Sequence, residues 1–155
     1  MFNMTRKARN TLGLVLLAAC TVALAADNHA LLNPGATNEF DLPNGGRVVQ
    51  AVSSGFNIMG DTGDPLHMSN MDCNGTTESD AGGDTVQGGG FCTLADKDHE
   101  AVWLWWAIDA DGGTWGVFAG TGKYAGATGG GTWEFGEQWP DGKVENNWRG
   151  EINLK

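Results

Sequence analysis

The last 25 residues alternate apolar and polar side chains with a period of two, and this pattern constrains the fold more than any other feature. Its apolar members are Trp133, Phe135 and Trp139, followed by Val144, Trp148, Ile152 and Leu154. Successive side chains of a strand point to opposite faces, so each set predicts a strand with one apolar face. Pro140–Lys143, which reads PDGK, predicts the hairpin turn between the two strands.

The rest of the chain from residue 46 also favours strands. Even positions between Arg47 and Ile58 are largely apolar, and the stretch from Ala101 to Ile108 is a run of strand-forming residues. No segment beyond residue 26 shows a sustained helical period, and the density of glycine (25 in the chain) disfavours helices. Turn signals recur at roughly the 8–12-residue spacing typical of sandwiches and barrels.

We therefore predict an all-β protein, an antiparallel closed barrel of about eight strands. Closure is favoured because it removes exposed sheet edges. Residues 46–155 are expected to form this single domain. Residues 27–45 are rich in turn formers and lack a clear period, so we expect them to form an extended lead-in.

Residues 1–26 have the pattern of a secretory signal peptide. Basic residues at the start precede an uncharged apolar run, and the small residues Ala23-Leu24-Ala25 predict cleavage near Ala25 or Ala26. The apolar run is too short for a membrane span. A second interpretation stays open, because Leu16–Cys20 (LLAAC) resembles a lipobox, in which Cys20 would become the lipidated first residue. We favour export to the periplasm or the extracellular space over lipidation, since the segment after Cys20 remains apolar.

The exported part is strongly acidic. All 19 Asp and Glu follow residue 26, together with six of the nine Lys and Arg, which gives a formal charge of −13. Such a chain repels phosphate backbones, so we expect no nucleic-acid partner. The acidity by itself requires no function beyond solubility.

Two cysteines, Cys73 and Cys92, lie beyond the signal. In an oxidising compartment such a pair is expected to form a disulfide, which would stabilise the fold by about 3 kcal/mol. A zinc site is the alternative, but two thiols do not complete a tetrahedral set, and neither His67 nor His99 has ligand spacing. We predict no metal and no cofactor.

The glycine-rich stretch from Gly120 to Phe135 (GTGKYAGATGGGTWEF) could be a phosphate-binding loop or the junction of two strands. A P-loop would need glycine at 117 and a hydroxyl residue at 124, where Val117 and Tyr124 stand. A dinucleotide fingerprint would have to open a helix, and a strand pattern follows instead. We therefore predict two strands joined by a tight turn, with Tyr124 plugging the end of the barrel. Its glycines are Gly120, Gly122, Gly126, Gly129 and Gly131.

This stretch resembles the signature of the allene oxide cyclase and dirigent-like β-barrels, especially small exported bacterial members. The segments around Cys73 and Cys92 also look like the paired-cysteine strands of those proteins. The resemblance covers roughly Val48 to Leu154. It implies an eight-stranded antiparallel barrel with an apolar interior, often oligomeric, but it does not imply cyclase activity, because no catalytic residue of the plant enzymes can be matched here.

Other constellations are better explained as turns. Asp109–Gly113 (DADGG) suggests a calcium loop but lacks its remaining ligands, and Asp-Gly is a common hairpin turn. Asp96–Glu100 (DKDHE) is expected to be a solvated acidic turn. No catalytic triad is recognisable. If the interior does chemistry, a buried carboxylate is the expected group, with Glu78 and Glu100 as candidates by position.

All seven tryptophans lie between Trp103 and Trp148. We predict an apolar ligand site built from aromatic residues, namely Trp103, Trp105, Trp106, Trp133 and Phe135. Because neighbours on a strand face opposite sides, Trp103 and Trp105 cannot share a side with Trp106. One face must therefore carry exposed or interface tryptophan, and oligomer contact is a hypothesis for it.

The function expected from these features is the binding of a small apolar ligand, or an envelope role, without catalysis. Two alternatives stay open. One is a cofactor-independent cyclase or isomerase that shapes an apolar substrate, and the other is an oligomeric structural protein. Whether the chain is an enzyme is left undecided by the sequence.

Overall fold

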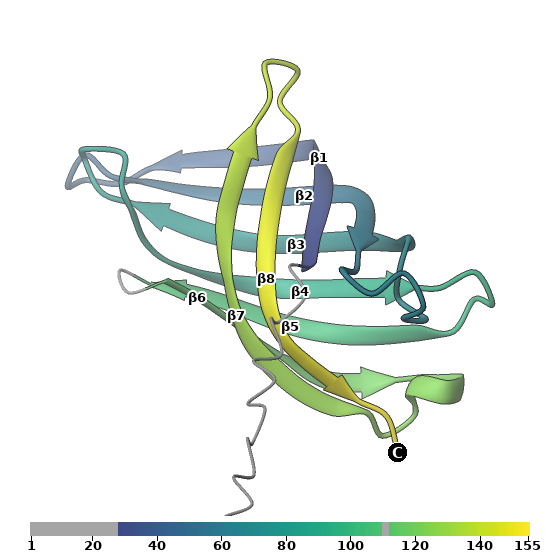
Figure 1. The fold of residues 1–155 in the computed structure, drawn as a ribbon. Coiled ribbons are helices and arrows are strands. Elements are labelled where there is room, and N and C mark those ends of the chain that lie inside the picture. Colours follow the sequence, from purple (N-terminus) through teal and green to yellow (C-terminus); the bar gives the residue numbers. More distant parts are fainter. Residues whose placement is uncertain (1–27, 110–111) are drawn as a thin grey trace, which may run out of the picture.

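A computed structural model describes residues 28–109 and 112–155. The chain forms a closed all-β barrel (Figure 1). Its elements are β1 (Asn28–Asp41), β2 (Arg47–Ile58), β3 (Ser69–Ser79), β4 (Thr85–Ala95), β5 (Ala101–Asp109), β6 (Gly112–Gly120), the 3₁₀ turn η1 (Gly122–Tyr124), β7 (Thr128–Gln138) and β8 (Val144–Asn153). The signal peptide and lipidation predictions concern residues outside the described part.

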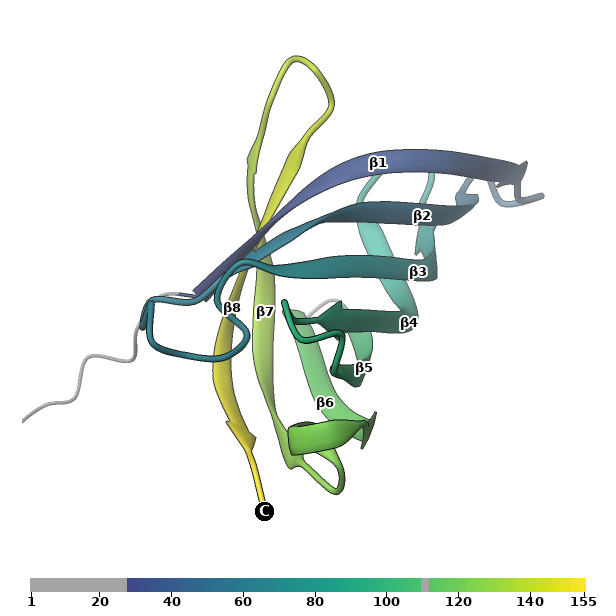
Figure 2. The ribbon, with the colours of Figure 1, turned by 90° about the vertical axis from the view of Figure 1, so that its right-hand side faces the viewer.

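Each strand pairs antiparallel with the next, and β1 pairs with β8 to close the sheet. The predicted fold class, an eight-stranded antiparallel barrel with one disulfide and little helix, is confirmed. The predicted hairpin is the β7–β8 unit, which projects beyond the other strands (Figures 1 and 2). Within the described residues, no helix has the length and apolar character needed to cross a membrane.

The barrel begins earlier than residue 46, where the sequence pattern placed its start. The segment predicted as an extended lead-in is extended, but most of it is β1, which pairs with β2 on one side and with β8 on the other. A register shift between Pro34 and Thr37 interrupts its alternation. That irregularity, together with its turn-forming residues, explains why β1 lacked a clear period.

The two ends of the barrel differ. The closed end carries the β2–β3 loop (residues 59–68), the β4–β5 turn (residues 96–100) and η1. The open end carries the turns that follow β1, β3 and β7. The β7–β8 turn and η1 lie at opposite ends of the molecule (Figures 1 and 2). Most of the buried core lies toward the closed end: Ala30, Leu32, Leu66, Met71, Leu94, Val102, Leu104, Trp115, Tyr124, Ala127 and Trp148.

A cross-strand row of glycines and two tryptophans runs around the middle of the barrel, and we call it the Trp–Gly belt. Its members pair in the order Gly75, Gly90, Trp106, Trp115, Gly131 and Gly150, from β3 to β8. A Cβ at Gly75 would collide with the Trp106 indole, and one at Gly150 would lie 2.9 Å from Cζ2 of Trp115. Each indole therefore extends across the interior over a glycine two strands away. Gly131 of the glycine-rich stretch has a different role, since a Cβ there would collide with the backbone carbonyl of Arg149 on β8.

The apolar face recognised on β2 lies outside the barrel. Phe56 is 48% exposed and does not line the interior, whereas Ala51, Ser53 and Asn57 do; Val52 borders the interior but remains 47% exposed. The space available inside the barrel explains this arrangement. Tryptophans from β5 to β8 already extend into the interior, so small or polar residues fit on the inner face of β2.

Candidate functional site

The barrel interior holds a cavity of about 290 Å³, lined by residues from all eight strands. The wall is buried toward the closed end, where Leu94 is 1% exposed and Asn57 is fully buried. Lining residues toward the open end, such as Pro34, Ala51 and Phe135, are exposed to solvent. The cavity is therefore a preformed well that opens at the open end of the barrel, with a volume at the lower limit of small-molecule pockets.

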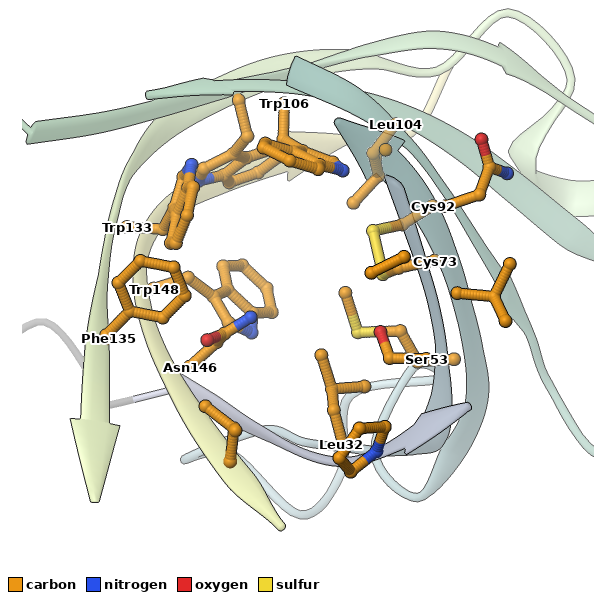
Figure 3. Close-up of a pocket in the computed structure, with 18 of the residues that line it drawn as sticks. Leu32, Ser53, Cys73, Cys92, Leu104, Trp106, Trp133, Phe135, Asn146 and Trp148 are labelled. Carbon is orange, nitrogen blue, oxygen red and sulfur yellow. A yellow bond between two sulfur atoms is a disulfide. The ribbon is translucent and has the colours of Figure 1, made fainter. Parts of the chain in front are cut away.

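One side of the well is aromatic, as Figure 3 shows. The rings of Trp106 and Trp133 meet edge to face with centroids 5.7 Å apart, and Trp133 meets Phe135 in the same way at 5.0 Å. Deeper in the barrel Trp115 packs edge to face against Trp148 at 5.2 Å. These residues come from β5 to β8 and present ring faces and edges to any occupant.

The other side, from β1 to β4, is aliphatic and sulfur-rich. It carries Leu32, Ser53, Met71 and the Cys73–Cys92 disulfide, which faces the cavity (Figure 3). The two cysteines are direct cross-strand partners on β3 and β4, and their sulfurs lie 2.02 Å apart. The predicted disulfide is thus present and forms part of the wall, where the polarisable sulfurs of Met71 and the bridge suit an apolar occupant.

Few polar groups reach the cavity. Asn57 is fully buried and satisfied: its Oδ1 accepts from Trp148 Nε1 at 3.0 Å, and its Nδ2 donates to the carbonyl of Leu66 at 3.1 Å. Asn146 differs, because its Oδ1 is buried without a hydrogen-bond partner. None of the described residues that line the cavity has an ionisable side chain, once the disulfide has removed the two thiols.

The five predicted ligand residues fall on two surfaces. Trp106, Trp133 and Phe135 line the cavity together. Trp103 and Trp105 do not line it, because they alternate with the inward residues Leu104 and Trp106 and so face outward. Trp105 is 39% exposed, and its indole lies against Gly116 of β6. The assignment of Trp103 and Trp105 to the interior site is therefore wrong.

Neither candidate carboxylate reaches the cavity. Glu78 faces outward on β3, where its Oε2 accepts from Gln87 Nε2 at 2.8 Å. Glu100 lies at the closed end, where its carboxylate accepts from the backbone N–H of Lys123 and lies 3.5 Å from the Lys123 ammonium. The strand parity of Glu78, and the turn position of Glu100, account for their absence from the interior.

The glycine-rich stretch forms the plug of the closed end. Gly122, Lys123 and Tyr124 make one 3₁₀ turn; Gly122 within it and Gly126 just after it adopt positive φ (53° and 74°). The ring of Tyr124 is fully buried, and its hydroxyl donates to Oδ2 of Asp96 at 3.0 Å. The predicted role of Tyr124 as a barrel plug is confirmed.

Asp96 was expected to be a solvated turn residue, and that prediction is wrong. Its side chain is 1% exposed and pairs with the Lys123 ammonium at 2.7 Å. Burial alone raises the pKa of Asp96, but bonds from Lys123, Tyr124 and the backbone N–H groups of Asp98 and Glu100 outweigh it and lower the pKa to about 2. Burial and the neighbouring Asp96 raise the pKa of Tyr124 above its usual value, so the phenol stays protonated.

No cluster of three or more potential metal ligands occurs within residues 28–109 and 112–155. The suggested calcium loop includes residues 110–111, which lie outside the described part. The acidic turn at 96–100 uses Asp96 to hold Tyr124 and Lys123.

The main site residue that the sequence analysis missed is Asn146. It lies on β8 between the inward residues Val144 and Trp148, so it interrupts the apolar face of the alternation. A polar residue at an apolar parity was the available signal. Ser53 and Met71 were missed as well, since neither stands out from its neighbours in sequence.

Comparison with protein-family models, curated proteins and solved structures gave no significant match to this chain.

Proposed function

We propose that this protein binds a small, neutral, largely apolar molecule inside the barrel. One observation carries the proposal: a preformed well of about 290 Å³, aromatic on one side and sulfur-rich on the other, with no ionisable side chain among its described lining residues. Burial of an apolar ligand there replaces water at apolar surface and is favourable without specific chemistry. The ligand's apolar body would lie between the aromatic and sulfur-rich walls.

Native mass spectrometry of gently purified protein tests this proposal. We expect a population carrying additional mass from a neutral molecule, which organic solvent extracts. Protein without bound mass that also takes up no apolar probe would contradict the proposal.

The cyclase or isomerase alternative would use the same well. It requires polar groups that converge on a substrate, and Ser53 and Asn146 supply such groups from β2 and β8. Both side chains are neutral, so they could orient a substrate but not carry a proton as a strong acid or base. Binding without turnover is therefore the better supported function. Membership of the allene oxide cyclase and dirigent-like barrels remains a prediction.

Self-association is a second candidate role, favoured by an aromatic cluster on the outside of β4 to β6. Phe91 and Phe118 are 51% and 54% exposed, and their rings meet at 5.3 Å. Trp105 is the cross-strand partner of Phe91, so the cluster is continuous over three strands. Exposed contiguous aromatic surface is typical of interaction sites. Sedimentation of wild type and Phe118→Ser tests this role, with an assembly expected only in wild type; a wild-type monomer at high concentration would contradict it.

We propose that the protein is exported and acts in the periplasm or the extracellular space. The acidic, disulfide-bonded barrel fits an oxidising compartment. The intact mass of the mature protein separates the two proposed processing routes, because cleavage near Ala25 or Ala26 removes Cys20, whereas lipidation retains it with added acyl mass.

A further inference from the structure

The side chain of Asn146 lies where its oxygen could accept a hydrogen bond from a ligand. It lies on β8 opposite Ala30 of β1 and Phe135 of β7, and its side chain enters the cavity beside Trp148 (Figure 3). Its Oδ1 is buried and accepts no hydrogen bond. Buried carbonyl oxygens in proteins are nearly always paired, so an unpaired one in a cavity wall points to a partner from outside the chain.

Three of the four tryptophans that line the cavity already donate their indole N–H within the protein. Trp148 donates to Asn57, Trp115 donates to the carbonyl of Arg149, and Trp133 donates to the carbonyls of Ala107 and Thr114. The contrast with Asn57 is informative, because both asparagines line the same cavity and Asn57 has partners for both ends of its amide. Asn57 therefore has a structural role at the base of the well. The Asn146 oxygen has no donor within the protein, so it could accept a hydrogen bond from a ligand.

We propose that Asn146 selects ligands with a hydrogen-bond donor, so that the ligand class is a neutral apolar alcohol or phenol. This inference rests on the proposed function. A hydrocarbon would leave the buried Asn146 oxygen without a hydrogen bond, whereas a ligand with a donor would satisfy it and gain affinity. A ketone offers only an acceptor. A carboxylate would place a charge in a cavity whose described lining supplies no cation, inside a chain whose residues beyond 26 carry a formal charge of −13.

Binding of four naphthalene probes to the full mature protein tests the proposal: naphthalene, 2-naphthol, 2-acetonaphthone and 2-naphthoate. They share a ring system and differ in the group offered to Asn146. We expect 2-naphthol to bind about tenfold more tightly than naphthalene, since an unsatisfied buried acceptor costs roughly that factor or more. The ketone should bind no better than naphthalene, and the carboxylate should bind most weakly.

The variant Asn146→Leu removes the acceptor at similar volume. It should weaken 2-naphthol to the level of naphthalene while leaving naphthalene affinity within about twofold, which also shows that the well is intact. Asn147→Leu, on the outward face of the same strand, is the matched control and should retain the preference for 2-naphthol.

The outcomes separate the two proposals. Equal affinity for naphthalene and 2-naphthol, or equal weakening of both probes in Asn146→Leu, would overturn the role of Asn146 while leaving the proposed function in place. Preference for the ketone would also overturn it, because the amide would then be donating. Failure of all four probes to bind would overturn the proposed function, and this inference with it.

Discussion

The two ends of this barrel are built from similar residue types but organised for different purposes. At the closed end, Tyr124 is fully buried and its hydroxyl is held by Asp96, which in turn pairs with Lys123. At the open end, Phe135 lines the well while remaining 53% exposed. Paired polar groups and filled space make the closed end a source of stability. The well that opens at the other end has exposed apolar surface and the unpaired oxygen of Asn146. This end of the barrel is therefore available for ligand binding.

Aromatic truncation at each end should give the largest difference. Tyr124→Ala removes a fully buried ring and leaves Asp96 without one of its donors, so we expect a loss of about 4 kcal/mol in the free energy of unfolding. Phe135→Ala should cost less than about 1 kcal/mol, because that ring is half exposed. Urea denaturation measures both values. Similar losses for the two variants would remove the distinction between the ends.

Loss of the disulfide should have the next largest effect. The Cys73–Cys92 bridge closes a short loop between β3 and β4 beside the well. A Cys73→Ser/Cys92→Ser double variant should be about 3 kcal/mol less stable in urea denaturation. We also expect weaker probe binding, since the wall loses its cross-link. Unchanged stability would show that pairing of β3 with β4 suffices without the bridge.

Acid should destabilise the closed end through Asp96. Its pKa is lowered in the folded state from 3.8 to about 2, so its stabilising contribution is complete above about pH 4 and declines as the pH falls toward 2. The contribution corresponds to about 2 kcal/mol. Comparison of wild type and Asp96→Asn at pH 5 and pH 2 isolates it. The stability gap between the two proteins should shrink at the lower pH, and a constant gap would contradict the assignment.

Glycine-to-alanine substitutions beneath tryptophans should cost more stability in the interior than on the surface. Gly75→Ala forces the Trp106 indole to move within the packed interior, so we expect a loss of about 2 kcal/mol and a changed cavity. Gly116→Ala forces only the exposed Trp105 to move, and the loss should stay below about 1 kcal/mol. Thermal unfolding compares the two, and a greater cost at Gly116 would contradict the packing described for the belt.

Sequence periodicity predicted the strands well but not the direction in which they face. Alternation identified the β7–β8 hairpin and the opposite facing of Trp105 and Trp106, because these depend on local backbone geometry alone. The outward face of β2 depended on tryptophans that enter the interior from other strands. The burial of Asp96 likewise depended on contacts with Lys123 and Tyr124, more than 25 residues away in sequence. Asn146 became significant only when the cavity around it was known.

Binding of a neutral naphthalene probe to wild type and to two neighbouring variants tests the central claim most directly. Ser53→Leu fills the well from inside β2, whereas Ser54→Leu adds the same side chain on the exposed outer face. We predict that the probe quenches tryptophan fluorescence saturably in wild type and in Ser54→Leu, and that Ser53→Leu lowers its affinity at least about tenfold while remaining folded. Equal binding to all three proteins would contradict the claim that the barrel interior is the binding site.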